Sequence, residues 1–410
     1  MSTKVRRQYQ SSFQVIQDTQ SQIREFVTQE MRGAALALVH GLFLEEIESL
    51  CGSRFSRKGV QGYHRGGSDP GSVILEGQRV AVRKPRARKE GQDVQLTSYQ
   101  ALQGFDLLQE RVRKQMMAGV STREYEGLLD EVSGGLGLKR SSVSKAFVRG
   151  SKQQLEALNG RDLSSYEWAA LMIDGIEYAG SCVVVALGIT IEGKKLVLGL
   201  RRGDTENWEV CKDLLQALID RGLKHDEPFL LVLDGSKALR KAARKVFGEH
   251  FPVQRCVRHK ERNVMSYLPP SQHAEFRRRF KLAHSMTKYS DAKLEIDRLI
   301  HWLKERNLEA AASLEESAGE TLTVVALGAT AALRRTLCST NPIESTFSRV
   351  RSRTRRVRRW RKDTDQIERW AGACLLEAES RFKAIRGADE LKVFVATVRR
   401  KSLPSKSEAA

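Results

Sequence analysis

Two acidic residues follow apolar runs whose spacing would bring them together. Residues 169–173 end in Asp174-Gly175, and residues 229–233 end in Asp234-Gly235. A short buried strand holds a charge in its interior only at high cost, so each acid is expected at an edge of the sheet. Two such strands in one sheet would place both carboxylates where a pair of divalent metal ions could bind for phosphoryl transfer. Each Asp-Gly pair also fits a simple turn, and for either site alone that alternative stays open.

Glu344 is the candidate for a third acid. Asn341 can cap a helix and Pro342 suits its first position, which puts Glu344 in the first turn. An acid at this place is also ordinary helix design, as in a capping box. The metal-binding hypothesis is favoured by the cations that follow, nine in the fourteen residues 349–362. They repel one another unless an anion such as DNA phosphate compensates, although nonspecific basic runs look similar. The predicted DNA contacts in this run are Arg349, Arg353, Arg356 and Arg359.

Cys256 and His259 form a C-x2-H pair at the end of a predicted strand. Two soft ligands are too few for a structural zinc site. A positioning role beside the carboxylates is therefore favoured over zinc. A buried cysteine that happens to lie near a surface histidine remains an equally good description.

The elements around these residues have the order of an RNase H-like domain. Three strands joined by short connections (169–174, 182–190 and 196–200) indicate an antiparallel meander. Helix 205–221, strand 229–234, helix 236–247 and strand 251–256 follow. The predicted fold is multi-domain: an α/β RNase H-like catalytic domain with a mixed sheet and an α-helical insertion, preceded by mostly α-helical DNA-binding regions.

The domain boundaries follow changes in pattern along the chain. Residues 107–148 read as three helices, the last beginning near Arg140, which suits a helix-turn-helix unit that contacts DNA through Arg140, Ser142 and Lys145. A trihelical scaffold with no DNA contact is the alternative. The predicted regions are an N-terminal helical region (1–58, for packing or self-association), a basic linker with a short hairpin (59–105), the helix-turn-helix domain (106–160), the first part of the catalytic domain (161–259), the helical insertion (260–335), the C-terminal helices (336–400) and a disordered tail (401–410).

Composition favours a polyanionic partner. The net charge is +20, from 70 Lys and Arg against 50 Asp and Glu, which on a globular chain points most often to nucleic acid. No apolar run approaches the roughly 18 residues of a membrane span, so no membrane partner is expected. Six scattered cysteines give neither a disulfide framework nor a four-cysteine zinc site, which favours a reducing cytoplasm.

Several short motifs together resemble the Mutator-type transposases of bacterial insertion sequences. They run in order over about residues 59–382: Gly119-Val120-Ser121-Thr122-Arg123, Ile173-Asp174-Gly175, Gly203-Asp204-Thr205-Glu206-Asn207-Trp208, Leu233-Asp234-Gly235, Cys256-x-x-His259 and Thr340-Asn341-x-Ile343-Glu344-Ser345. The resemblance implies a DDE transposase whose catalytic, metal-binding acids are Asp174, Asp234 and Glu344. It further implies Mg²⁺ dependence (two ions, with Mn²⁺ as a substitute), recognition of terminal inverted repeats in double-stranded DNA, and action in the nucleoid as a homodimer or larger oligomer.

Two rival functions stay open. A DNA-binding regulator or domesticated transposase would hold DNA ends without cutting them, although three intact acids argue against it. A metal-dependent nuclease would cut without joining the product to a second DNA.

Overall fold

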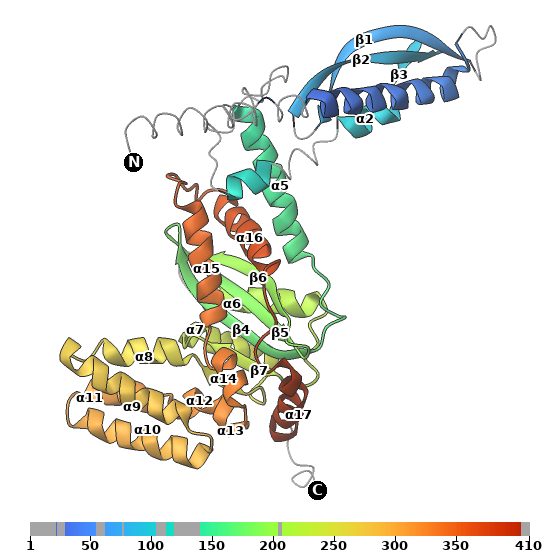
Figure 1. Cartoon of the computed structure of the whole chain (residues 1–410). Coiled ribbons are helices and arrows are strands. Elements are labelled where there is room, and N and C mark those ends of the chain that lie inside the picture. Colours follow the sequence, from blue (N-terminus) through green and yellow to red (C-terminus); the bar gives the residue numbers. More distant parts are fainter. Residues whose placement is uncertain are drawn as a thin grey trace, which may run out of the picture. The chain divides into compact units, whose positions relative to one another are not determined.

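The computed structural model describes residues 22, 29–54, 62–75, 78–103, 112–118, 140–203 and 207–402 (Figure 1). The chain divides into two compact units, Met1–Gly150 and Ser151–Ala410. Each has its own hydrophobic core, and each is described by itself.

A three-stranded antiparallel sheet covered by a helix forms the described core of the first unit. The strands are β1 (Tyr63–Leu75), β2 (Gln78–Lys89) and β3 (Gln92–Val94), and the short helix α2 (Thr97–Leu102) follows. The helix over 29–51 packs on the sheet through one apolar stripe. The residues of the two clusters in this interface are Val39, Phe43, Val73, Val82, Ile47, Cys51, Ala87 and Leu96.

This sheet corrects the prediction of a linker with a short hairpin. Leu75 pairs with Gln78, and the Gly-rich residues before 72 pair with β2 as well. Arg86 of β2 forms ion pairs with Asp69 (3.1 Å) and Asp93 (2.9 Å). These ion pairs hold the basic segment within the sheet. The numbers of glycines and cations in the sequence do not indicate such pairing.

The predicted helix-turn-helix lies mostly outside the described residues, which omit 119–139. Its third helix is α5 (Arg140–Asn159), which begins where predicted but continues well beyond the predicted end at residue 148. Tertiary contacts explain the extension. Leu158 is fully buried, and its carbonyl accepts a hydrogen bond from Arg221 Nη1 (2.7 Å).

A five-stranded mixed sheet forms the centre of the second unit. The strands are β4 (Trp168–Tyr178), β5 (Ser181–Thr190), β6 (Lys195–Gly203), β7 (Leu230–Leu233) and β8 (Val253–Arg255). Their order is β6-β5-β4-β7-β8, with antiparallel pairing among the first three and parallel pairing of β7 to β4 and of β8 to β7. The predicted meander followed by two crossovers is therefore confirmed.

Helices cover both faces of this sheet (Figure 1). On one face, α6 (Trp208–Asp220) and α7 (Lys237–Phe247) pack against Leu171, Ile173 and neighbouring side chains. Gly222, with φ +86°, follows the C-cap residue Arg221 of α6. α15 (Asn341–Thr354) contacts β4, and its Phe347 packs edge-on to Tyr178 with ring centroids 5.9 Å apart. α16 (Gln366–Glu379) packs on β6 and α15.

The segment between β8 and α15 is helical throughout its described length, as predicted. Its elements are α8 (Val257–Met265), η1 (Pro270–Gln272), α9 (His273–Ser285), α10 (Tyr289–Lys304), α11 (Leu308–Glu315), α12 (Ala318–Thr321), α13 (Thr323–Ala326) and α14 (Ala331–Leu337). Gln254, on β8, fixes this segment to the sheet. Its buried amide donates to Thr321 O (2.8 Å) and accepts from Val324 N (2.9 Å).

The chain ends its described part with η2 (Ala388–Glu390) and α17 (Leu391–Ser402). The first two residues of the predicted disordered tail thus belong to a helix, and residues 403–410 lie outside the described ones. None of the described helices is both long and apolar enough to span a membrane.

Candidate active site

Asp174 lies inside β4, which corrects the prediction that it ends the strand. Its backbone pairs with Val185, and β4 continues to Tyr178 in a hairpin with β5. The parallel pairing with β7, however, stops at Ile173 and Leu233. Asp174 therefore lies at the end of the pairing between β4 and β7 but within the pairing between β4 and β5. Its side chain is buried, and the residue is 0% exposed.

Asp234 directly follows β7, in line with Asp174 across the β4–β7 pairing. Because Ile173 and Leu233 both face the core beneath α6 and α7, strand alternation points Asp174 and Asp234 toward the opposite face. Asp234 is half-buried, and its Oδ1 accepts a hydrogen bond from Ser236 N (2.8 Å). This bond closes the turn that leads into α7, as the turn alternative expects, and the functional role of Asp234 stays a prediction.

Glu344 lies in the first turn of α15, with Pro342 just before it as predicted. The predicted cap at Asn341 is wrong: the N-cap is Thr340, whose side chain points into the protein rather than capping the helix. Glu344 Oε1 lies 3.3 Å from His259 Nε2, and the same carboxylate forms an ion pair with Arg262. These contacts join α15 to α8 and favour a site role over a capping box.

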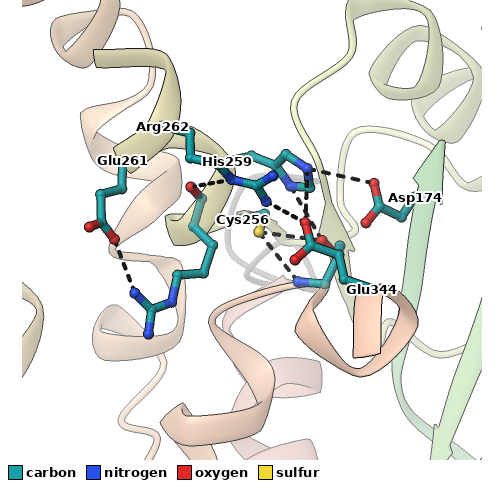
Figure 2. Close-up of polar contacts among 8 residues, drawn as sticks. Asp174, Cys256, His259, Glu261, Arg262 and Glu344 are labelled. Carbon is teal, nitrogen blue, oxygen red and sulfur yellow. Dashed lines mark hydrogen bonds and ion pairs between the residues drawn. The ribbon is translucent and has the colours of Figure 1, made fainter. Parts of the chain in front are cut away.

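Cys256 and His259, which Figure 2 shows beside the acids, are joined through hydrogen bonds with Thr340. The Thr340 hydroxyl donates to Cys256 Sγ (3.3 Å) and lies 3.4 Å from His259 Nδ1. Since that hydroxyl proton is directed to sulfur, its oxygen can accept from Nδ1, which leaves the lone pair of Nε2 toward the acids. The Cys256 thiol is buried, and burial raises its pKa. The contacts suit a thiol that orients the histidine better than a thiolate that binds metal.

His259 faces both acids and cations. Its Nε2 is 4.0 Å from Asp174 Oδ1. Burial and the nearby Arg262 guanidinium lower the pKa of His259, while Glu344 and Asp234 act in the opposite direction. A lowered pKa favours the neutral ring, which is the form that can bind a metal ion.

One cluster of three residues in the described part of the chain has the donors for a divalent cation. Ligand atoms of Asp174, His259 and Glu344 all lie within 4.8 Å of one another. Carboxylate oxygens suit Mg²⁺ and Mn²⁺, and an imidazole nitrogen is a common ligand of the transition metals. Asp234 is adjacent by strand pairing but is outside this close group. The sequence analysis predicted two members of this cluster, Asp174 and Glu344, as metal-binding acids, and predicted that the third, His259, positions the carboxylates.

The predicted DNA-binding residues lie on two helices and the segment after the second. Lys145 is exposed on α5, and Arg140 and Ser142 belong to the first turn of that helix. Arg349 is exposed on α15, and Arg356 and Arg359 are exposed in the segment that follows it. Arg353 differs, because it is only partly exposed and forms an ion pair with Glu377 of α16 (3.0 Å). The structure therefore gives Arg353 a packing role that the sequence did not indicate.

Two residues near the acids were missed. Arg262 lies three residues after His259 on α8, and helix periodicity alone would have placed both on one face. Arg255 is 6% exposed and lies against Gly235, where an added Cβ would be 2.1 Å from its Nε. No pattern in the sequence marks this contact, because it joins two strands' ends.

The chain is similar in sequence to transposases of bacterial insertion sequences. The chain is 29% identical over 244 residues to the transposase for insertion sequence element IS6120 of Mycolicibacterium smegmatis, covering 58% of this chain and 74% of that protein. It is 29% identical over 276 residues to the transposase for IS256 in transposon Tn4001 of Staphylococcus aureus, covering 64% and 67%. The transposase for IS905 of Lactococcus lactis is 27% identical over 224 residues, covering 52% and 54%. The family model for "Transposase, Mutator family" matches residues 6–385, and the chain belongs to this family of transposases.

Proposed function

We propose that this chain is the DNA transposase of an insertion sequence, which binds terminal inverted repeats and catalyses metal-dependent strand cleavage and strand transfer. The observation that carries the proposal is the convergence of Asp174, His259 and Glu344 beside Asp234, from four separate elements of one unit. The order β6-β5-β4-β7-β8 with a helical segment before α15 supports an RNase H-like, DDE-type catalytic domain.

In this mechanism Asp174, Asp234 and Glu344 would hold Mg²⁺, or Mn²⁺ in its place, with His259 beside them. Bound divalent ions supply an activated water or 3′-hydroxyl and stabilise the leaving oxygen of the phosphodiester. Asp174 is held in place by its pairing with Val185 of β5, one residue beyond the end of the pairing between β4 and β7. Glu344 comes from a helix end, so its approach depends on how α15 sits on β4.

The protein's other contributions are orientation and charge. Thr340 and Cys256 orient His259 through the contacts described above. Exposed Arg349, Arg356 and Arg359 would bind phosphates of the DNA near the site. Lys145 and its neighbours on α5 would contact the terminal repeat. By the family resemblance, the active form would be a homodimer or larger oligomer acting on paired DNA ends in the nucleoid.

Strand cleavage of a labelled duplex carrying the element's own end tests this function. With Mg²⁺ the wild type is expected to cleave at the end, and Asp174→Asn and Glu344→Gln are expected to bind the duplex but not cleave it. Glu177→Gln, a change at an exposed acid of the same strand as Asp174, serves as the matched control and should cleave normally.

Three outcomes would contradict the proposal. Binding without cleavage by the wild type in Mg²⁺ and in Mn²⁺ would indicate a DNA-binding regulator. Cleavage with no joined product on a second duplex would indicate a nuclease. Equal cleavage by wild type and Glu344→Gln would return Glu344 to a purely structural place in its helix.

A further inference from the structure

A cationic hollow lies on α7 and the start of α6, apart from the acids. It has a volume of about 670 Å³ and is lined by Trp208, Lys237, Arg240, Lys241, Arg244, Lys245 and Glu249. Five of these side chains are cations and one is an acid. Such an excess of one charge on a surface attracts an anion.

Two of the five cations have acidic partners and three do not, within the described part of the chain. Arg244 pairs with Glu249 (3.1 Å), and Arg240 pairs with Glu320. Lys237, Lys241 and Lys245 are at least partly exposed, and no ion pair engages them there. Their spacing of four residues places them in a row, about 6 Å apart along the helix axis. A row of this length suits an extended polyanion better than a single small anion.

Trp208 contacts the middle lysine of the row. Its ring lies 4.9 Å from Lys241 Nζ and 5.5 Å from Lys212 Nζ, so two lysines rest on one indole. Cation–π contacts of this kind restrict long, flexible side chains. The tryptophan thus adds a fourth lysine, Lys212, to the surface and holds both ammonium groups near the hollow.

The position of the row relates it to the candidate active site. α7 begins at Lys237, three residues after Asp234, so the row starts at the edge of the sheet that carries the acids. α7 packs on the face of the sheet that buries Ile173 and Leu233, whereas Asp174 and Glu344 lie on the α15 side. The lysine row and the arginines of α15 therefore lie on opposite faces of the sheet, and the row starts near the edge that carries Asp234.

Strand transfer requires two duplexes to meet at one set of catalytic groups. We propose that the hollow on α7 binds the phosphate backbone of the target DNA, while the α15 side holds the transposon end. This inference rests on the proposed function and adds the surface for the second DNA. Lysines that contact phosphates position a duplex without reading its bases, which suits a target of varied sequence.

The test compares Lys237→Gln/Lys241→Gln/Lys245→Gln with a control that removes the same charge elsewhere. Lys281→Gln/Lys288→Gln/Lys293→Gln serves as that control, because these three are also exposed and lie on or near α9 and α10. The protein is first saturated with unlabelled end duplex, and binding of a labelled duplex without the repeat is then measured over a range of salt. Joining of precleaved ends to the same duplex is measured in parallel.

For the α7 variant, binding of the second duplex should weaken on the order of 10- to 100-fold near 0.1 M salt, and the slope of log K against log [salt] should become shallower by about 3. Joining should fall by a similar factor. Binding and cleavage of the end duplex should stay within about twofold of wild type, and the control should change neither property.

Three results would overturn the inference. Equal losses in the α7 variant and the control would mean that only net charge matters. Weaker binding of the end duplex in the α7 variant would assign the row to the transposon end. An unchanged affinity for the second duplex would remove the row from DNA binding altogether. The affinity measurement needs no catalysis, so a wild type that never cleaves would refute the proposed function while still testing the hollow.

Discussion

Gly235 offers a sharp test of how the turn after β7 holds Asp234. Its φ is +112°, a conformation that side chains with a Cβ rarely adopt. A Cβ at this position would lie 2.1 Å from Arg255 Nε and 2.4 Å from its Cζ. Arg255 is only 6% exposed, so its guanidinium has little room to withdraw. Gly235→Ala therefore combines backbone strain with a steric clash.

The two effects can be separated by a second glycine. Backbone strain costs about 1–3 kcal/mol, and forcing atoms into a packed site costs about 1–3 kcal/mol more. Gly328 has φ +77° but nothing within 4 Å of an added Cβ, so Gly328→Ala carries the strain alone. We expect Gly235→Ala to lower the free energy of unfolding by about 1–3 kcal/mol more than Gly328→Ala.

Urea unfolding followed by tryptophan fluorescence is the suitable assay. All five tryptophans, at 168, 208, 302, 360 and 370, belong to the second unit, so the signal reports on that unit alone. Adding Arg255→Ala to the Gly235→Ala variant should restore part of the lost free energy of unfolding, since the two positions are in contact. Equal destabilisation by Gly235→Ala and Gly328→Ala would refute the idea that Arg255 fixes this turn.

Two further predictions concern the same unit. His284 Nδ1 lies 2.8 Å from Phe280 O, and burial lowers the pKa of the ring to about 4 from 6.5, so the unfolded chain takes up a proton first as pH falls. As the pH falls from 6.5 to 4, the free energy of unfolding of the second unit should decrease by at most roughly 3 kcal/mol. Urea unfolding over this pH range should show a smaller decrease for His284→Asn than for the wild type. Equal decreases in the two proteins would exclude His284 as the cause. Arg353→Gln should lower the free energy of unfolding by about 1 kcal/mol by breaking the ion pair with Glu377. Arg349→Gln removes an exposed side chain of α15, so it should change the free energy of unfolding by less than about 0.5 kcal/mol while weakening DNA binding. Equal unfolding curves for Arg353→Gln and Arg349→Gln would contradict the packing role of Arg353.

The central sheet could be predicted because its strands are runs of β-branched and aliphatic residues separated by short turns. The expectation that an acid marks the end of a buried strand, however, placed the end of β4 too early. A charge after an apolar run suggests an edge, yet Asp174 is followed by four more residues that pair with β5. Alternation within a hairpin can bury an acid in mid-strand when a neighbouring helix supplies polar partners, and the sequence does not show which helix that is.

The first unit escaped prediction for a different reason. β1 contains three glycines and a proline, which usually mark loops, and β2 is highly basic. Its stability depends on partners distant in sequence: a helix over 29–51 that covers its apolar positions, and acids such as Asp69 and Asp93 that neutralise Arg86. Such contacts override local propensity, and local pattern cannot reveal them.

The candidate site shows why the helical segment after β8 matters to chemistry at the sheet. Its first helix, α8, brings both His259 and Arg262 to Glu344. In this arrangement the guanidinium of Arg262 compensates the carboxylate of Glu344, so that acids brought together from separate elements do not simply repel one another. A divalent cation that took up Glu344 would compete with Arg262, whose side chain is 57% exposed and can turn outward to a DNA phosphate. Under the proposed function, Arg262 would neutralise Glu344 before DNA arrives and would contact a DNA phosphate afterwards, so α8 would couple the binding of metal to the binding of DNA.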